Sequence, residues 1–519
     1  MSELIEHIVI LGGGTAGWLT AGILAAEYQA RGGSTLQITL IESPDVPTIG
    51  VGEGTWPSMR LSLQRIGLSE IDVIQQCDAS FKQGSKFVGW KNGLPDDIYY
   101  HPFTAPQGFG EANFVAAWRE HFSHLSFADT VCIQSQLCEQ GFAPKQKTTP
   151  EYAGVLNYGY HFDAGKFAQL LQKHCTQKLG VKHLLDHVTQ VVSAASGDIA
   201  ALLTKQSGAV AGDLFIDCSG TNCLLLGEHY GIPFIDKNQF SINDRALAVQ
   251  VPYRSSDDPI ASPTIATAQD AGWTWDIGLS SRRGVGYVYS SSHSTDEHAE
   301  QTLRAYVSKS IGPKNIENIS VKRLSIRPGH REKFWHKNCV AVGMAAGFIE
   351  PLEASALALV ELSATSIRDN LPLAKTDMAI VAKRFNEVFC CRWQGIIDFL
   401  KLHYALSERN DTVYWRDVTQ RDNLSKPLAE HLSLWRQRPP AQQDFIHGND
   451  IFPAASYQYV LYGMGFKPLA HGIGKTSDRI DFALRNINDN IERARKYMTA
   501  IPTNRELLAH INQYGMQRI

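Results

Sequence analysis

The start of the chain carries the pattern that most restricts its fold: an apolar strand, a glycine-rich turn and a helix in direct succession. His7–Leu11 reads H-I-V-I-L, a run typical of a buried parallel strand. It leads into Gly12–Gly17, G-G-G-T-A-G, and then into a helical stretch from Trp18 to about Ala30. The spacing is G-x-G-x-x-G in the strand–turn–helix context that the motif requires. We therefore expect a Rossmann-type dinucleotide site here.

The residues of this motif have separate physical roles. Gly12 permits the tight turn, Gly14 lets the backbone approach a pyrophosphate, and Gly17 lets the helix pack closely on the strand. Free amides at the helix N-terminus then face the phosphates. A second strand, Leu36–Ile41, ends in Glu42, whose carboxylate can accept hydrogen bonds from a ribose 2′-OH and would repel a 2′-phosphate.

A later block points to FAD as the dinucleotide. Gly212–Gly220 reads G-D-L-F-I-D-C-S-G, an apolar strand that ends in Asp217 and Gly220. This arrangement is typical of the second nucleotide-contacting strand of FAD-binding folds, which simple NAD dehydrogenases do not need. The cofactor expected from the residues is therefore FAD.

Composition limits the partners and the compartment. A chain of 519 residues with 44% hydrophobic and 19% charged residues predicts two globular lobes. The net charge of -3 gives no electrostatic footprint for nucleic acid or an anionic membrane. Met1–His7 does not resemble a signal peptide, and the apolar run Cys339–Ile349 is too short to cross a bilayer. Nine cysteines without C-x-x-C spacing indicate reduced thiols in the cytoplasm and no metal site.

Sequence blocks spread over nearly the whole chain resemble those of flavin-dependent tryptophan halogenases. They are Gly12–Trp18, Ile49–Ser58, Phe81–Phe87, Tyr160–Ala164, Asp213–Gly220, Gly272–Ile277, Gly286–Ser290, Glu350–Ala356 and Asp398–Tyr404. Their order and separation match the family. The resemblance implies FAD contacts at Gly12, Gly14, Thr15, Ala16, Gly17, Glu42, Ser43, Val51, Gly54, Val188, Asp217, Met344 and Leu357. No second cofactor domain is visible, so a separate flavin reductase is expected to supply FADH2.

The resemblance also implies a catalytic pair, Lys82 and Glu353. Lys82 would receive hypohalous acid, as a haloamine or through a hydrogen bond, and present the halogen to the substrate. On residue type alone, Lys82 would be interpreted as a solvated surface lysine. The segment that contains Phe81 and Phe87 is, however, too apolar for a simple surface loop. Glu353 would orient the halogen or take the arenium proton; read without the resemblance, it complements the dipole of a helix first turn.

The same segment predicts the halide site. Pro351 is well placed to open a helix through Leu352–Leu371. Amides near Ser355 and Ala356 would then lack intrahelical partners and could bind chloride or bromide without a cationic side chain. The family usually has Ser-Thr-Gly after the glutamate, whereas this chain has Ala354-Ser355-Ala356, which leaves the halide preference open.

Aromatic residues indicate the substrate chamber. Trp273 and Trp275 stand in a W-x-W-x-I-P signature; such a pair points to one face of a strand and is usually core, whereas in the family it helps separate flavin from substrate. Gly278 replaces the customary proline, which should loosen the turn. His101 and Phe103 match residues that line the substrate chamber in the family. An ordinary loop with packed aromatic side chains would explain these two residues equally well.

The organic substrate is the least determined feature. Free-tryptophan halogenases usually carry Phe-Trp and an Asn-Gly-Asn-Tyr-Tyr run before a glycine-rich turn. This chain keeps the turn at Tyr462–Gly465, but Asn449–Tyr459 reads N-D-I-F-P-A-A-S-Y-Q-Y and lacks those anchors. A pocket without its amino-acid clamp loses the polar contacts that make recognition sharp. We hypothesise that indole or another electron-rich arene is accepted, and that tryptophan is a poor substrate or is not the native one.

The expected architecture is α/β. A FAD-binding Rossmann-type, flavin monooxygenase-like domain over 1–370 would include an antiparallel substrate-side sheet within Gly231–Tyr289. A mainly helical domain over 371–519 would follow, with helices at Met378–Tyr404 and Asp478–Thr499. The implied reaction is FADH2-dependent halogenation of an aromatic ring. A flavin-dependent aromatic monooxygenase and a non-catalytic FAD-binding protein are the alternatives, and monomer and homodimer stay open.

Overall fold

The chain forms two compact units, each assembled from three separate segments. The computed structural model describes residues 4–30, 36–46, 52–317, 319–420, 423–445, 451–469 and 479–518. Unit 1 comprises Met1–Ala79, Phe162–Lys237 and Arg327–Cys391, and unit 2 comprises Ser80–His161, Asn238–Ile326 and Arg392–Ile519. The predicted division near residue 370 was placed where helical periodicity begins to dominate the sequence, and it stays a prediction.

Unit 1 is built on a mainly parallel sheet whose strand order is β20-β21-β12-β1-β2-β8. The strands are β1 (His7–Leu11), β2 (Gln37–Glu42), β8 (Lys182–Leu185), β12 (Leu214–Asp217), β20 (Trp335–His336) and β21 (Cys339–Ala341). β1 pairs in parallel with β2 on one side and with β12 on the other. Its apolar residues are fully buried, as the uninterrupted run H-I-V-I-L predicts. The predicted Rossmann-type sheet is therefore confirmed.

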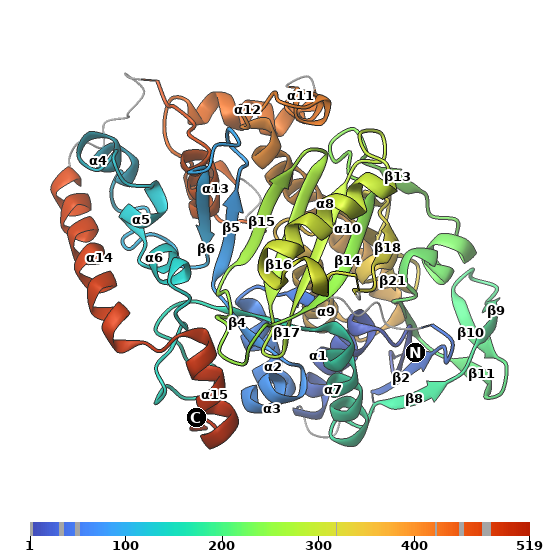
Figure 1. The fold of residues 1–519 in the computed structure, drawn as a ribbon. Coiled ribbons are helices and arrows are strands. Elements are labelled where there is room, and N and C mark those ends of the chain that lie inside the picture. The colour runs from blue at the N-terminus through green and yellow to red at the C-terminus, as the bar shows by residue number, and fades with distance from the viewer. Residues whose placement is uncertain are drawn as a thin grey trace. The chain divides into compact units, whose positions relative to one another are not determined.

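Helices cover this sheet (Figure 1). The helix after the glycine turn, α1 (Thr15–Ala30), packs against α7 (Ala164–Gln177) and α9 (Ser355–Asn370). Two short helices, α2 (Ser58–Ile66) and α3 (Glu70–Gln76), follow the short strand β3 (Gly52–Gly54). The smaller sheets contain β9 (Val188–Ser193), β10 (Ile199–Thr204) and β11 (Gly208–Ala211), and β13 (Phe234–Asp236), β19 (Gly329–Arg331) and β22 (Gly347–Phe348).

A buried carboxylate lies where α2 meets α9. The hydroxyls of Ser58 and Ser62 donate to Glu361, at 3.1 and 2.5 Å. Burial raises the pKa of the Glu361 carboxyl from 4.5 to about 7, and the two serine hydroxyls oppose that rise. Because the folded-state pKa lies above the unfolded value, ionisation of Glu361 destabilises the fold increasingly as the pH rises from about 4.5 to about 7.

We predict that Glu361→Gln stabilises the protein at alkaline pH. The shift corresponds to about 3 kcal/mol above pH ~7, and none of this is present below pH ~4.5. The melting temperature of the variant relative to the natural protein should therefore increase between about pH 4.5 and about pH 7 and stay level at higher pH. A difference in melting temperature that does not change with pH would contradict the prediction. Burial also raises the pKa of Glu53 to about 7, but Glu53 is present in both proteins. Its effect on stability therefore cancels in the difference between their melting temperatures.

Unit 2 contains a sheet of order β18-β14-β17-β16-β15-β5-β6. Its strands are β5 (Gly84–Val88), β6 (Ile98–Pro102), β14 (Arg245–Pro252), β15 (Thr264–Gln269), β16 (Gly272–Gly278), β17 (Arg282–Tyr289) and β18 (Lys322–Ser325). Only β15 and β5 pair in parallel among the described ladders of this sheet. The inward residues Leu247, Val285 and Tyr287 form a core with α8 (Asp296–Ile311). The predicted antiparallel sheet within Gly231–Tyr289 is confirmed.

Unit 2 also contains several helices. They are α4 (Phe114–His121), α5 (Phe127–Val131), α6 (Gln134–Glu139), α11 (Val413–Val418), α12 (Lys426–Trp435), α13 (Ala454–Gly463), α14 (Ile480–Ala500) and α15 (Asn504–Tyr514). α13 packs on β6, and α14 contacts α4, α5 and α6. The long helix α10 (Met378–Ala405) begins in unit 1 and ends in unit 2. The predicted helices at Met378–Tyr404 and Asp478–Thr499 are therefore found, with Asp478 outside the described residues. No helix in the described ranges has the length and apolarity to span a bilayer.

Candidate active site

The glycine turn of unit 1 has the shape of a dinucleotide cradle. Gly12 has φ +118°, and a Cβ there would collide with the Cys218 carbonyl. A Cβ on Gly17 would collide with the Gly12 carbonyl, so this glycine lets α1 pack against the turn. A Cβ on Gly14 would meet nothing within 4 Å, which leaves the backbone open to an approaching pyrophosphate. The three glycines therefore have the geometry predicted for them, and the turn fits a dinucleotide.

Glu42 lies beside this turn at the end of β2. A Cβ on Gly13 would overlap the Glu42 side chain, so a glycine is required there as well. His183 Nε2 is 2.9 Å from Glu42 Oε2, a neighbour that the sequence did not indicate. The carboxylate is partly exposed and can still accept a bond from a ribose hydroxyl, as predicted.

Asp217 has a structural task in its own loop. It is fully buried; one carboxylate oxygen accepts from the Ser219 amide at 3.1 Å and the other from the amides of Leu225 and Leu226, at 2.8 and 2.9 Å. Its oxygens therefore shape the loop after β12. A direct bond from Asp217 to a cofactor stays a prediction.

The other predicted cofactor contacts lie in several elements of unit 1. Ala16 lies next to the turn Gly343–Ala345, where a Cβ on Gly343 would be 2.8 Å from the Cβ of Ala16. Met344 is exposed and Leu357 is buried in the first turn of α9. Thr15 begins α1, Gly54 ends β3 and Val188 begins β9. Ser43 Oγ lies 3.4 Å from His187 Nδ1. Val51 lies outside the described residues.

The helix that follows Glu353 begins later than predicted. Pro351 does not open it: α9 starts at Ser355, and Ala354 adopts a left-handed conformation with φ +54°. The Ala354 amide closes a turn on the Pro351 carbonyl at 3.1 Å, so Pro351–Glu353 precede the helix. The earlier prediction was wrong because a single left-handed residue separates the proline from the helical run.

Glu353 is positioned by this turn. Its side chain is buried, and its main-chain carbonyl accepts a hydrogen bond from the Trp56 indole at 2.8 Å. Glu350 is buried as well. Ser355 and Ala356 become the first two helical residues, so their amides have no intrahelical acceptor. Ser355 is buried and Ala356 is exposed, and binding of a halide by their amides stays a prediction.

Lys82 is a buried lysine in unit 2. It ends the short strand β4 (Ser80–Lys82), which pairs with β7 (Gly159–Asp163). Its exposed fraction is 1%, and its Nζ lies 5.4 Å from the centre of the Phe103 ring. The interpretation of Lys82 as a solvated surface residue is therefore wrong. The structure brings the predicted residues Lys82 and Phe103 together.

A histidine next to Lys82 was missed by the sequence reading. His161 lies opposite Ser80 in the β4–β7 ladder and therefore shares a face with Lys82. Its Nε2 is 2.8 Å from Thr264 Oγ1. Burial, and secondarily the Lys82 ammonium, lower the pKa of His161 well below its usual value, so the ring is neutral. The motif Y-H-F-D-A was the available signal, but a histidine in a strand gives no indication of its neighbours.

Two buried glutamines form a further polar network after Lys82. Gln83 Nε2 donates to the Phe142 carbonyl at 2.7 Å. Gln134 Nε2 donates to Gln83 Oε1 at 3.1 Å and to the Asn157 carbonyl at 2.6 Å. Because both carboxamides are satisfied inside the protein, they fix the chain beyond Lys82.

The predicted chamber residues His101 and Phe103 lie in and after β6. His101 is in a strand, so the alternative of an ordinary loop is wrong for this residue. Its Nε2 is 2.8 Å from Ser456 Oγ, and Phe399, Phe452 and Tyr459 surround its ring. His101 therefore belongs to an aromatic cluster with α10 and α13.

Trp273 and Trp275 share one face of β16, as expected. Their ring centres are 6.4 Å apart and both are buried. A Cβ on Gly286 would collide with the Trp275 indole, which therefore lies over this position of β17. Gly278 ends β16 and still pairs with Arg283, so the expected loosening of the turn is not seen. Its carbonyl accepts a hydrogen bond from the Ser80 hydroxyl.

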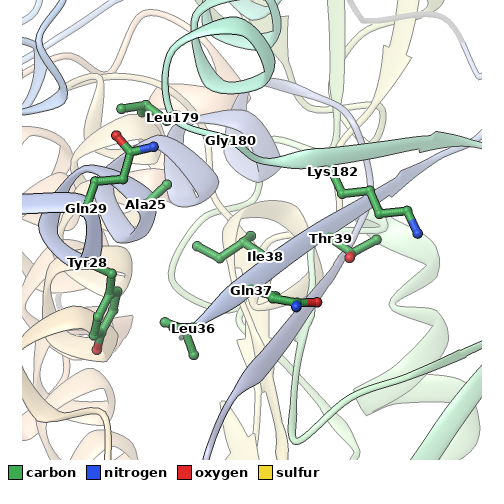
Figure 2. A pocket seen from close by; sticks show the side chains of 10 residues that line it. All are labelled: Ala25, Tyr28, Gln29, Leu36, Gln37, Ile38, Thr39, Leu179, Gly180 and Lys182. Atoms are coloured by element: carbon green, nitrogen blue, oxygen red, sulfur yellow. The ribbon is translucent and has the colours of Figure 1, made fainter. Parts of the chain in front are cut away.

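A separate pocket in unit 1 has no connection with these predictions. It has a volume of about 280 Å³ and lies among α1, β2 and the start of β8 (Figure 2). Its lining includes Tyr28, Gln29, Thr39 and Lys182, and none of the ten residues labelled there is a predicted site residue. Within the described ranges, no group of three His, Cys, Asp or Glu side chains could hold a metal ion.

Comparison with known proteins identifies the family. The family model described as tryptophan halogenase matches residues 7–476. A tryptophan 6-halogenase of Streptomyces toxytricini is 31% identical, and the match covers 98% of each chain. A tryptophan 7-halogenase of Lentzea aerocolonigenes is 30% identical over 98% of this chain and 99% of that one. The crystal structure of a tryptophan halogenase from Shewanella frigidimarina, 50% identical, has a TM-score of 0.96 and covers 100% of this chain and 99% of that one. The chain therefore belongs to the tryptophan halogenase family, which confirms the predicted α/β fold class and the predicted flavin-dependent halogenase.

Proposed function

We propose that this halogenase uses FADH2, oxygen and chloride or bromide to halogenate an electron-rich arene through Lys82 and Glu353. The observation that carries the proposal is the burial of Lys82, whose side chain is 1% exposed and lies beside the Phe103 ring and the neutral His161. Burial of an ammonium is costly, so an amine held out of water beside an aromatic ring and a neutral imidazole supports a chemical role for Lys82 rather than a solvated one.

The glycine turn and its neighbours are proposed to hold FAD. The amides at the start of α1 would receive the pyrophosphate over Gly14, and Glu42 would receive a ribose hydroxyl. Reduced FAD, when bound, would supply the two electrons that activate oxygen for oxidation of the halide to hypohalous acid. A separate flavin reductase would deliver it. The cytoplasmic location stays a prediction.

The first turn of α9 is proposed to hold the halide. The amides of Ser355 and Ala356 have no acceptor within the helix, and the positive end of the helix dipole favours an anion there. A backbone site does not depend on the hydroxyl that Ala354 lacks. Chloride and bromide both fit this description.

Lys82 is proposed to carry the halogen. In the covalent version, its neutral amine takes the halogen from hypohalous acid, so that an N–halogen bond replaces an N–H bond and water leaves. The arene then attacks that halogen, the N–halogen electron pair stays on the nitrogen, and a proton from water restores the N–H bond of the amine. Glu353 accepts the proton that the ring carbon loses. In the hydrogen-bonded version, the ammonium polarises hypohalous acid and Glu353 has the same task.

An arene without an amino-acid group is proposed as the preferred substrate. In the described part of α13, Gln458 Nε2 donates to the Pro440 carbonyl at 2.8 Å, Ser456 Oγ lies 2.8 Å from His101 Nε2, and the Tyr459 hydroxyl donates to the Thr104 carbonyl at 2.9 Å. The buried Tyr462 hydroxyl is the exception, with no hydrogen-bond partner among the described residues. Asn449 and Asp450 lie outside the described residues. These contacts support indole over free tryptophan, because recognition of an amino acid needs unengaged polar groups.

A matched pair of glycine variants tests the cofactor site. We predict that Gly14→Ala keeps the stability of the fold and weakens FAD binding about tenfold or more, because its methyl enters the open side of the cradle. Gly17→Ala should instead destabilise the protein by about 1–3 kcal/mol, because its methyl collides with the Gly12 carbonyl. Flavin fluorescence titration and thermal melting separate the two effects. Equal FAD affinity in Gly14→Ala and the natural protein would place the cofactor elsewhere.

Mass spectrometry of products tests the function as a whole. The purified protein would be supplied with a flavin reductase, NADH, FAD, oxygen and bromide or chloride, with indole, tryptophan and phenols as substrates. A halogen isotope pattern is expected, with kcat/KM greater for indole than for tryptophan. Comparable turnover of the two at low concentration would refute the substrate proposal. Hydroxylated product, or no product beside well-bound FAD, would refute halogenation.

A further inference from the structure

The strand that carries Lys82 is extended on its outer side by a side chain. β4 lies at the edge of its sheet, with β7 as its neighbour. On the other side, Asn504 Oδ1 accepts a hydrogen bond from the Phe81 amide at 3.4 Å, and Asn504 Nδ2 donates to the Phe81 carbonyl at 3.0 Å. Because the amide and carbonyl of one strand residue point to the same side, the carboxamide takes the place of a further strand.

Asn504 is itself fixed in position. It is fully buried and is the first residue of α15, whose start is closed by a capping box between Thr503 and Glu506. The Asn504 amide donates to the Gly141 carbonyl at 2.8 Å, and the Ala143 amide donates to the Pro502 carbonyl at 2.9 Å. The carboxamide therefore presents its two groups to Phe81 from a rigid helix start.

Only a carboxamide satisfies both groups of Phe81 at this place. It is neutral and offers one acceptor and one donor on the same planar group. An aspartate would offer acceptors only, leaving the Phe81 carbonyl unpaired and burying a charge, and a leucine would leave both main-chain groups unpaired. A purely hydrophobic contact does not explain an asparagine with an exposed fraction of zero.

These bonds fix the main chain around Lys82. Asn504 holds Phe81 before it, and the Gln83 amide after it donates to the Ser262 carbonyl at 2.8 Å. The direction of the Lys82 Cα–Cβ bond is therefore set from both sides. A reacting amine must be placed within a fraction of an ångström, and small displacements are costly in rate.

We propose that Asn504 is a positioning residue for Lys82, acting by completing the edge of β4. The inference deepens the proposed function, on which it rests for the role of Lys82. It assigns a positioning task to α15, whose first residue is 423 residues from Phe81 in sequence.

Kinetics of a matched pair of variants test the proposal. Asn504→Asp removes the donor to Phe81, whereas Asn490→Asp removes an equivalent buried donor, Nδ2 to the Val131 carbonyl at 2.9 Å, in α14. We expect Asn504→Asp to lower kcat about tenfold or more with the arene KM nearly unchanged, and Asn490→Asp to keep kcat within about twofold. Equal loss of kcat in the two variants would overturn the proposal, because it would reflect general destabilisation.

Chemical labelling of Lys82 gives a readout that needs no turnover. Acetic anhydride would be applied briefly, and acylation of Lys82 would be compared by peptide mass spectrometry with acylation of Lys86, which is partly exposed and serves as internal reference. We expect Asn504→Asp to change the ratio by about threefold or more, because a freed strand edge opens locally, and Asn490→Asp to leave it unchanged. If the natural protein halogenates nothing, this ratio alone decides: a changed ratio supports the positioning role, and an unchanged ratio refutes it.

A conservative variant distinguishes loss of the hydrogen bonds to Phe81 from loss of folding. Asn504→Gln keeps the donor and the acceptor on a side chain longer by one methylene. We expect it to recover part of the kcat and of the Lys82 labelling ratio relative to Asn504→Leu, at similar melting temperatures. Identical kcat and labelling in Asn504→Gln and Asn504→Leu would show that the hydrogen bonds to Phe81 do not matter.

Discussion

Lys82→Met is expected to lower the rate of halogenated product formation on the order of 10³-fold, because the positioned amine that carries the halogen is lost. Methionine has a similar length and is apolar, so it should fill the buried space at the end of β4 without leaving a charge unpaired. FAD affinity should be unchanged. The oxidant should still form, and a thiol trap should collect it as free hypohalous acid. Mass spectrometry of arene products together with the trap assay measures both quantities.

Lys86→Met is the matched control for this experiment. Lys86 lies in the same sequence block, on β5, but its Nζ is 2.6 Å from Glu139 Oε2 and lies over the Tyr100 ring. Losing a partly exposed ion pair should cost about 1 kcal/mol of stability or less and little activity. If Lys82→Met retained most of its halogenation, or if both variants lost it equally, Lys82 could not be the halogen carrier.

Local sequence patterns predicted the elements whose causes are local. β1 was expected at His7–Leu11 and has those bounds, because an uninterrupted apolar run beside a glycine turn leaves few alternatives. α9 shows where this reasoning fails. A proline at a helix start is a good rule, but the left-handed Ala354 displaces the start to Ser355, and alanine in that conformation has no local signature.

The site was predicted less completely, because much of it depends on contacts between distant residues. Lys82 could be named from its sequence block, but nothing in that block indicates Asn504, which holds the neighbouring residue Phe81. His161 was inside a recognised block, and its proximity to Lys82 follows only from the β4–β7 register. Asp217 shows the opposite case: its position was predicted, and its carboxylate turned out to bind its own loop.

Glu353→Gln is expected to lower kcat on the order of 10²-fold and to make loss of the ring proton rate-limiting, because the amide cannot accept that proton. The fold should be unaffected: the Trp56 indole binds the main-chain carbonyl of Glu353, which the substitution keeps. Indole deuterated at the reacting carbon should then react more slowly than ordinary indole in the variant. In the natural protein, where the base is present, the two should react at nearly equal rates.

Glu350→Gln is the matched control, since Glu350 is equally buried three residues earlier in the same segment. It should show neither the loss of kcat nor the isotope effect. The isotope effect separates the two tasks that Glu353 could have. If Glu353→Gln lost activity without discrimination against deuterium, Glu353 would act on the halogen before the carbon–halogen bond forms, and another base would remove the proton. If Glu350→Gln showed the same isotope effect as Glu353→Gln, the effect would not be specific to Glu353, and Glu353 could not be assigned as the base.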